Sequence, residues 1–470
     1  MAAERAFVMV WDGLRPDYVT PTATPNLWRL AQQGVWFERS HAVYPTLTRA
    51  NSPAISTGCR PGRAGVPGNT FCLPSTGSLQ SYTSGDAANL QRLADADGRP
   101  VLLVETLADR VHRAGGRTVV VGSGSPGCTW LQHPRAPETG DLVIGQGLEN
   151  HSTALDELAA RFGPPPKRRV PATEWTTYFT RIICEYVVPE HEPTLLVFWH
   201  TDPDHTAHPR GHAAPETAQA LRDADANLGA VLESYERLGL RASTDVLVTS
   251  DHGSSSIARR VKPAHDLSAL LANGIAADNG GSVFVYSSDP AAVSAVRALD
   301  YAGPIFTRDG ATGTLPLSAI GLDGPRAPDV VFSLAWSEEV VDGLPGAAAG
   351  SHGRLLVDHG TISPYDVHNT LVAQGPDFKA GWRDPAPVGN IDIAPSLVHL
   401  LSLGNATPFD GRILSEAFVN GPADPPMFQS EDITAAFSAN GHEYVQRVTL
   451  ERVGETFYVA RGTIEPLVDE

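Results

Sequence analysis

The sequence has few cysteines, few lysines and no long hydrophobic run. Only 4 of its 470 residues are cysteine, and no two of them form a C-x-x-C pair. A zinc ribbon or a dithiol redox motif is therefore not expected. No apolar stretch approaches membrane-spanning length, and the N-terminus lacks the pattern of a signal peptide. We predict a soluble, cytoplasmic protein, and a secreted chain that had lost its signal peptide would look the same.

Positive charge is also scarce. The 35 Lys and Arg residues face 53 Asp and Glu, which gives a formal net charge of −18. An acidic surface repels long nucleic acid and anionic membranes, so neither is expected as a partner. A small phosphorylated substrate is compatible with this charge, because a bound metal or a local cation overrides the global field. The 16 histidines are the feature that needs an explanation.

Short apolar runs alternate with amphipathic helical segments along most of the chain. Strands are expected at residues 7–11, 117–121, 194–199, 245–249 and 283–286. Helices are expected at residues 25–33, 104–114, 217–235, 291–299 and 393–403. Strands that alternate with helices predict an α/β fold, with a mostly parallel central sheet and helices on both faces.

Two stretches interrupt this alternation. Residues 72–100 are rich in small and polar residues and are expected to cross the surface, and residues 140–189 are expected to form a cap. After residue 425 the pattern becomes β-like and predicts a terminal hairpin. We therefore expect one large domain over residues 1–425 and a short C-terminal β extension over residues 426–470 packed on it.

Acidic residues and histidines follow several of the predicted strands. They are Asp12, Asp204 with His208, and Asp251 with His252. A later pair, Asp358 with His359, precedes another apolar stretch at residues 370–373. In an open α/β sheet, ligands bind beyond the carboxyl ends of the strands. Each residue alone could be a helix cap or a turn residue. Together they form the carboxylate and imidazole mixture that divalent cations prefer, and they predict a metal site.

A threonine is the candidate nucleophile. Thr48 lies in the segment 44–51, which leads into a predicted helix start at residues 52–57. The positive end of a helix dipole favours an alkoxide or a bound phosphoryl group, and a neighbouring metal lowers the pKa of a hydroxyl. The alternative is that Thr48 is a helix N-cap, which is the commoner role of such a residue.

Taken together, these motifs resemble the alkaline phosphatase superfamily, and within it the type I phosphodiesterase and nucleotide pyrophosphatase family. The resemblance covers most of the first 415 residues and implies an alkaline-phosphatase-like catalytic domain. The motifs that carry it are Asp12-Gly13, Arg15-Pro16-Asp17-Tyr18, Thr24-Pro25-Asn26-Leu27, Pro45-Thr46-Leu47-Thr48, Thr57-Gly58, Asp204 with His208, Ser250-Asp251-His252-Gly253, His359-Gly360, Gly375-Pro376-Asp377-Phe378, Asp392-Ile393-Ala394-Pro395 and Asp410-Gly411-Arg412.

The resemblance also implies a role for each matching position. Thr48 would be the nucleophile that becomes phosphorylated, and Asn69 would donate a hydrogen bond to a phosphoryl oxygen. Two divalent ions would be bound, with zinc preferred and manganese or iron as alternatives. Their implied ligands fall into two sets: Asp12, Thr48, Asp251 and His252 for one ion, and Asp204, His208 and His359 for the other.

The activity that the resemblance implies is cleavage of phosphodiester or pyrophosphate bonds through a phosphothreonine intermediate. Hydrolysis of phosphomonoesters or phosphonates is the alternative within the same class, and a related isomerase or transferase could use the same metals. A metal-binding protein without catalytic activity is the alternative from another class.

Two motifs compete with these assignments. Residues Cys59-Arg60-Pro61-Gly62-Arg63 match the C-x-P-x-R signature of sulfatases. In sulfatases, however, Thr-Gly follows the nucleophile by nine and ten residues, and here Thr57-Gly58 stand at that distance from Thr48. This spacing assigns the nucleophile to Thr48 and not to Cys59. His352 also precedes a glycine, but the spacing to Gly375-Pro376 favours His359 as the last ligand.

One departure from the family concerns the residue after the nucleophile. Nucleotide-cleaving relatives have an aromatic residue there, whereas this chain has Arg49. A guanidinium could bind an extra phosphate oxygen or a substrate carboxylate, or it could form an ordinary surface ion pair. If Arg49 faces the site, a monoester or phosphonate substrate gains support over a nucleotide.

Overall fold

A nine-stranded sheet forms the centre of the computed structural model, which describes residues 2–77, 79–148, 154–271, 274–311, 313–404, 408–439 and 441–467. The strand order is β18-β2-β19-β8-β1-β7-β5-β6, and β20 pairs with β2. The strands are β1 (Arg5–Trp11), β2 (Val35–His41), β5 (Thr118–Gly122), β6 (Leu142–Ile144), β7 (Leu195–His200), β8 (Thr244–Thr249), β18 (His368–Asn369), β19 (Leu371–Gln374) and β20 (Trp382–Gly389).

Five neighbouring strands of this sheet are parallel, as expected. Strands β8, β1, β7, β5 and β6 all run in the same direction. Beyond them β19 runs antiparallel to both β8 and β2, so the complete sheet is mixed. Because the central strands are parallel, their carboxyl ends meet at one edge of the sheet.

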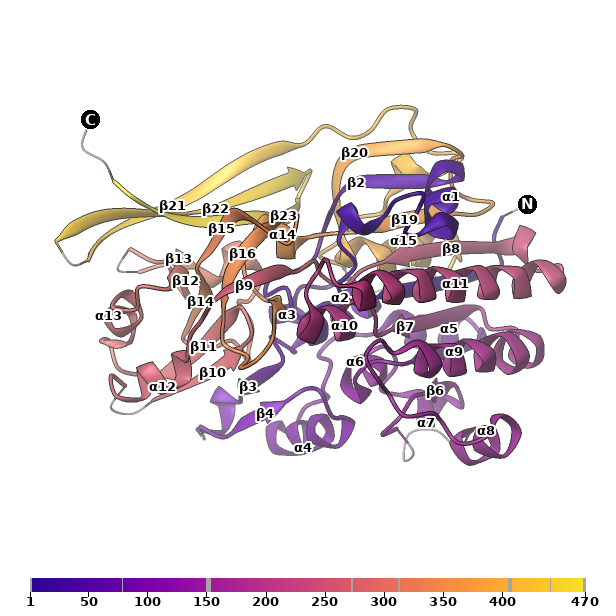
Figure 1. Cartoon of the computed structure of the whole chain (residues 1–470), viewed down its shortest axis with the longest axis horizontal. Helices are drawn as coiled ribbons and strands as arrows, with labels where there is room; N and C mark the ends of the chain where they lie inside the picture. Colours follow the sequence, from indigo (N-terminus) through magenta and orange to yellow (C-terminus); the bar gives the residue numbers. More distant parts are fainter. Residues whose placement is uncertain are drawn as a thin grey trace.

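Helices cover both faces of the sheet (Figure 1). Phe7, Met9 and Trp11 of β1 pack against α1 (Pro25–Gln33), α9 (Thr173–Ile182) and α11 (Pro215–Arg237). The alternate residues Val8 and Val10 face α2 (Thr48–Thr57), α5 (Leu107–Arg113), α6 (Pro126–Trp130) and α15 (Ile393–Leu400). Side chains of a strand point alternately to opposite faces, so β1 contributes to two cores.

A second, mostly antiparallel sheet lies beside the first and corrects one expectation. The predicted strand at 283–286 is β11 (Ser282–Ser287), which belongs to a sheet of order β10-β11-β14-β12-β13. It pairs antiparallel with β10 (Gly274–Asn279) across the tight turn Gly280-Gly281, where Gly280 has φ +63°. A two-residue hairpin leaves no room for the crossover that a parallel strand needs. The other strands of this sheet are β12 (Ala302–Thr307), β13 (Leu315–Pro316) and β14 (Val330–Leu334).

Smaller elements complete the domain. A four-stranded sheet consists of β9 (Ser255–Arg260), β15 (Trp336–Val341), β16 (Leu344–Gly350) and β17 (Val357–Asp358), and β3 (Thr70–Cys72) pairs with β4 (Ser81–Thr83). The remaining α-helices of the described chain are α3 (Pro61–Ala64), α4 (Ala87–Asp97), α7 (Ala136–Thr139), α8 (Ala154–Phe162), α10 (Asp204–Arg210), α12 (Pro263–Ser268), α13 (Ala292–Arg297) and α14 (Pro364–Val367). None of the described helices combines the length and apolar character that a membrane crossing requires.

The two stretches expected at the surface differ from each other. The first, 72–100, is held by Arg326, which is 1% exposed and bonds Asp97 from Nε at 2.9 Å. The second, 140–189, is not only a cap, because it supplies β6 at the edge of the central sheet and α9 against α11. The polyproline run at 164–166 indicated a surface segment, so the apolar face of α9 was not recognised in the sequence.

The C-terminal extension is a three-stranded sheet and not the expected hairpin. It consists of β21 (Gln429–Ala439), β22 (His442–Val453) and β23 (Thr456–Pro466), and Figure 1 shows it in yellow at the end of the molecule away from α8 and α9. It contacts β2, β12 and β20 of the large domain. Tyr458 of β23 donates a hydrogen bond at 2.8 Å to the buried Asp392. β21 is exposed or half-buried along its whole length, so its sequence carries little of the apolar alternation that marks a strand.

Candidate active site

The residues that follow the parallel strands lie together at one edge of the central sheet. Asp12 follows β1, Asp251 follows β8, and Asp204 begins α10 after β7. The backbone joins two of these ends, since the Asp204 N–H donates to the Asp12 carbonyl at 3.0 Å. His359 follows β17 and approaches from the four-stranded sheet. Seven of the nine predicted site residues line one cavity of about 230 Å³: Asp12, Thr48, Arg49, Asn69, Asp204, His208 and His359.

The other two predicted residues, Asp251 and His252, lie behind this cavity and are fully buried. His252 Nε2 is 3.2 Å from Asp251 Oδ2 and 3.5 Å from Asp12 Oδ1. The Asp251 Oδ1 atom accepts hydrogen bonds from the backbone N–H groups of Gly13 and His252 at 3.0 and 3.1 Å. One carboxylate oxygen is thus fixed by the backbone, and the other is directed at the cluster.

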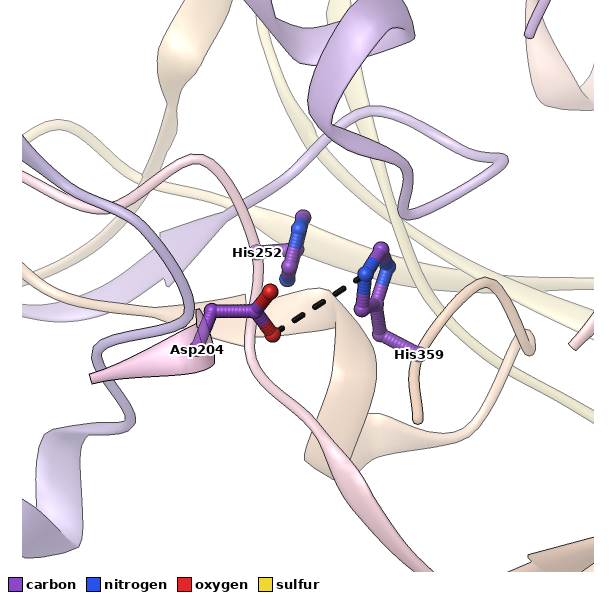
Figure 2. Close-up of side chains that lie close together, drawn as sticks. All are labelled: Asp204, His252 and His359. Atoms are coloured by element: carbon purple, nitrogen blue, oxygen red, sulfur yellow. Dashed lines mark ion pairs between the residues drawn. The ribbon is translucent and has the colours of Figure 1, made fainter. Parts of the chain in front are cut away.

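A second group lies directly beside the first. His208 Nε2 is 2.8 Å from Asp204 Oδ2, and His359 Nε2 is 4.0 Å from Asp204 Oδ1. Figure 2 shows Asp204, His252 and His359 converging from separate segments, and the His252 and His359 rings stack with centroids 3.6 Å apart. The donor atoms of these three residues all lie within 4.8 Å of one another.

All three histidines are oriented in the same way. Each places Nδ1 against a backbone carbonyl: His208 on Val357 at 2.7 Å, His252 on Gly253 at 2.8 Å and His359 on Thr46 at 2.8 Å. A carbonyl can only accept, so Nδ1 carries a proton, and in the neutral ring Nε2 keeps its lone pair. This tautomer is the one with which histidine binds a metal through Nε2.

The buried carboxylates of the site need positive charge nearby to balance their negative charge. Burial, together with the Asp251 and Asp204 carboxylates, raises the pKa of Asp12 well above its ordinary value. Burial opposes the charge of His252, yet the adjacent Asp251 raises its pKa to about 10. Three buried carboxylate oxygens have no hydrogen-bond partner: Asp12 Oδ1, Asp204 Oδ1 and Asp251 Oδ2. Unpaired buried carboxylates are costly, and divalent cations among them would remove that cost.

Thr48 is the first residue of α2 and lies at the junction of the two groups. Its side chain is 5% exposed, and Oγ1 is 3.3 Å from His252 Nε2. Leu47 occupies the N-cap position, so the alternative that Thr48 is an N-cap is wrong. The preceding loop is held by Thr46, whose Oγ1 donates to the Thr361 carbonyl at 2.8 Å and accepts the Gly360 N–H at 3.0 Å.

Asn69 lines the same cavity as Thr48. Its Oδ1 accepts the backbone N–H of Arg49 at 3.3 Å. Among the described residues, nothing accepts a hydrogen bond from its Nδ2. The amide nitrogen can therefore donate to a ligand bound at Thr48.

Neither competing residue fits the site better. Cys59 is 2% exposed and follows the far end of α2, about 15 Å from Thr48 along a helix of this length. His352 lines the cavity, but its Nδ1 is bound to Asp358 at 3.1 Å and its side chain is 45% exposed. His359 approaches Asp204 and stacks on His252, so the geometry favours His359 as a ligand.

Asp358, which the sequence analysis paired with His359, lies close to both His208 and His359, with one ligand atom of each residue within 4.8 Å of the others. The structure also adds residues that the sequence did not single out for the site. Trp199 donates from Nε1 to Asp12 Oδ2 at 3.1 Å. Arg168 and Ser125 line the cavity, and no motif marked either of them.

A larger open groove of about 710 Å³ lies near the opposite edge of the sheet. Its lining includes Arg29, Glu233, Glu236, Arg241 and Gln374. Arg241 precedes β8, whereas Asp251 follows it. None of the described carboxylate and histidine clusters lies in this groove, so the smaller cavity is the candidate active site.

Comparison with known proteins gives the family of the chain. The family model for type I phosphodiesterase / nucleotide pyrophosphatase matches residues 6–302. The chain belongs to this family. Family members are hydrolases that act on phosphoric ester bonds, and the matched segment carries Asp12, Thr48, Asp204 and Asp251.

Individual relatives are distant. Human ectonucleotide pyrophosphatase/phosphodiesterase family member 7 is 23% identical over 54% of this chain and 49% of its own length. Human family member 5 is 20% identical over 87% of this chain and 76% of its own. The match thus spans about half of the first of these relatives and about three quarters of the second.

Solved structures confirm the alkaline-phosphatase-like fold. Mouse ectonucleotide pyrophosphatase/phosphodiesterase 5 superposes with a TM-score of 0.64 at 18% identity, over 87% of this chain and 97% of that one. An inactive variant of the mouse protein has been solved in complex with AMP.

Proposed function

We propose that this protein is a metal-dependent phosphohydrolase that cleaves phosphodiester or pyrophosphate bonds through a phosphothreonine intermediate on Thr48. The observation that carries the proposal is the position of the Thr48 hydroxyl, 3.3 Å from His252 Nε2 and beside two groups of carboxylates and imidazoles. Family membership supports the reaction class, and the buried, unpartnered carboxylate oxygens support the metal dependence.

The residues present fit two divalent ions. Asp12, Asp251 and His252, with Thr48, would hold one ion, and Asp204, His208 and His359 would hold the other. Mixed oxygen and imidazole ligands suit zinc, and they also suit manganese or iron. When bound, the two ions would lower the pKa of the Thr48 hydroxyl and neutralise charge on the leaving oxygen.

The reaction uses two displacements at phosphorus. In the first, Thr48 Oγ1 loses its proton to solvent and forms a bond to phosphorus, while the bond to the leaving oxygen breaks and that oxygen takes up a proton. In the second, water attacks the same phosphorus, the bond to Oγ1 breaks, and Thr48 regains a proton. Asn69 Nδ2 would donate a hydrogen bond to a non-bridging oxygen in both steps, where negative charge accumulates.

Hydrolysis of a phosphomonoester or a phosphonate is the second candidate function. Arg49 favours it, because the guanidinium lines the cavity where nucleotide-cleaving relatives carry an aromatic ring. A monoester dianion needs one more positive partner than a diester does. In either case we propose a small phosphorylated substrate.

Removal of the metals should abolish activity. We expect protein dialysed against a chelator to lose hydrolysis of bis(p-nitrophenyl) phosphate, and added zinc or manganese to restore it, because the unscreened carboxylates repel an anionic substrate. Elemental analysis of the active protein should show two divalent ions per chain. Full activity in protein with less than about one tenth of an equivalent of any divalent ion would contradict metal dependence.

A further inference from the structure

Two arginines line the cavity that contains Thr48, and neither forms an ion pair with any described residue. Arg49 is the second residue of α2, and Arg168 lies in the loop between α8 and α9. Many other arginines of this acidic chain do pair with a carboxylate, for example Arg326 with Asp97 and Arg412 with Glu416. Two unpaired cations that face one small cavity therefore need a different explanation.

Arg49 is held in place without being neutralised. Its backbone N–H is bonded to Asn69, and its side chain is half-buried with Nε fully buried and without a partner. A buried donor that lacks an acceptor is destabilising, and more so when it is charged. The guanidinium can therefore donate a hydrogen bond to an acceptor on a bound ligand.

Arg168 is exposed at the rim of the cavity, but the loop that carries it is anchored. The carbonyl of the next residue, Arg169, accepts a hydrogen bond from His205 Nε2 at 3.0 Å, and the Ala172 N–H donates to Asp202 Oδ2 at 3.0 Å. The side chain itself donates from Nη2 to Thr201 Oγ1. These contacts tie the loop to the segment that leads into Asp204, and the other guanidinium donors remain available.

A third polar side chain lies at the same cavity. Ser125 lines the cavity, and its Oγ is buried without a hydrogen-bond partner. It occupies the N-cap position of α6, yet its side chain caps no backbone N–H. No Phe, Tyr or Trp is among the described residues that line this cavity, so those residues offer no aromatic face on which a nucleobase could stack.

We propose that Arg49, Arg168 and Ser125 form a subsite for a second oxyanion, a phosphate or a carboxylate carried by the substrate next to the phosphoryl group that is cleaved. The subsite rests on the proposed function of Thr48. Guanidinium groups bind such oxyanions through charge-assisted, often bidentate, hydrogen bonds. The substrate class is thus a compact, doubly anionic phosphoric or phosphonic compound and not a nucleotide with a neutral base at this position.

Three p-nitrophenyl phosphodiesters test the subsite directly. They share the nitrophenolate leaving group and differ in the other ester group, which is ethyl, 2-carboxyethyl or 2-phosphonoethyl. A p-nitrophenyl nucleotide ester is the fourth substrate. We expect the wild-type kcat/KM for at least one charged ester to exceed that for the ethyl ester by about 10-fold or more. The carboxyethyl and phosphonoethyl esters show which oxyanion is preferred.

Arg49→Met and Arg168→Met should each lower that charged-to-neutral ratio by about 10-fold, because each removes one charge-assisted contact. Arg169→Met is the matched control, because this neighbouring exposed arginine does not line the cavity. Its ratio should equal that of the wild type. Thermal unfolding of each variant verifies that it is folded.

Three results would overturn the subsite: equal kcat/KM for charged and ethyl esters in the wild type, an unchanged ratio in both arginine variants, or a preference for the nucleotide ester. Equal loss on all esters in the arginine variants would show a structural role and would also overturn it. Failure of the proposed function looks different: no ester is hydrolysed, or Thr48→Ala hydrolyses them as fast as the wild type.

Discussion

Thr48→Ala should lose about 10⁴-fold or more in kcat while it retains its bound metals, since removal of a nucleophile leaves only binding and electrostatic stabilisation. The substitution removes the hydroxyl that lies 3.3 Å from His252 Nε2, and the six carboxylate and imidazole ligands stay in place. The measurement combines steady-state hydrolysis of bis(p-nitrophenyl) phosphate with elemental analysis of the same sample. Thr48→Ser, which keeps a hydroxyl, should recover a large part of the rate.

Cys59→Ala is the matched control for this prediction. It removes the residue that a sulfatase would use, and the cysteine lies at the other end of α2, outside the cavity. Turnover should be preserved. A fast Thr48→Ala enzyme together with an inactive Cys59→Ala enzyme would reverse the assignment of the nucleophile.

Asp204→Asn should lower the metal content from two ions to one per chain and reduce kcat/KM by about 10³-fold, because a neutral amide is a much weaker ligand than a carboxylate. Asp204 Oδ2 is 2.8 Å from His208 Nε2, and Asp204 Oδ1 is 4.0 Å from His359 Nε2. The ion that should be lost is therefore the one that these three residues would hold. Asp12, Asp251 and His252 should retain their ion. Metal content is measured after dialysis, and kcat/KM on the same preparation.

A surface aspartate supplies the control for the loss of charge. Asp300 pairs with Arg259 on the surface, with a side chain that is 74% exposed. Asp300→Asn changes the net charge by the same amount, but exposed ion pairs contribute little to stability. If Asp204→Asn retained two ions and full activity, Asp204 would not be a ligand.

The strand-end residues show how much of the site could be predicted from the sequence. Asp12 and Asp251 follow continuous apolar runs, and a parallel sheet brings such ends to one edge. The structure places both beside His252, as that logic requires. His359 was already one of these acid and histidine residues, but its choice over His352 and its grouping with Asp204 and His208 rested on the family resemblance, because it reaches the site from β17 in a different sheet.

Arg168 shows what the sequence could not reveal. It lies in a stretch of prolines and basic residues that is typical of an exposed linker. Its place depends on two tertiary hydrogen bonds of this loop, in which His205 donates to the Arg169 carbonyl and Asp202 accepts the Ala172 N–H. The position of β11 was mistaken for a related reason. The apolar pattern identified a strand, but the pattern does not specify which sheet a strand joins.

The stereochemical course at phosphorus tests the central claim most directly. A phosphodiester substrate made chiral at phosphorus with sulfur and oxygen isotopes is hydrolysed in isotopically labelled water, and the configuration of the product is determined. Each in-line displacement inverts phosphorus, so a phosphothreonine intermediate on Thr48 predicts net retention. Net inversion would show that water attacks the substrate directly, and it would contradict the assignment of Thr48 as the nucleophile.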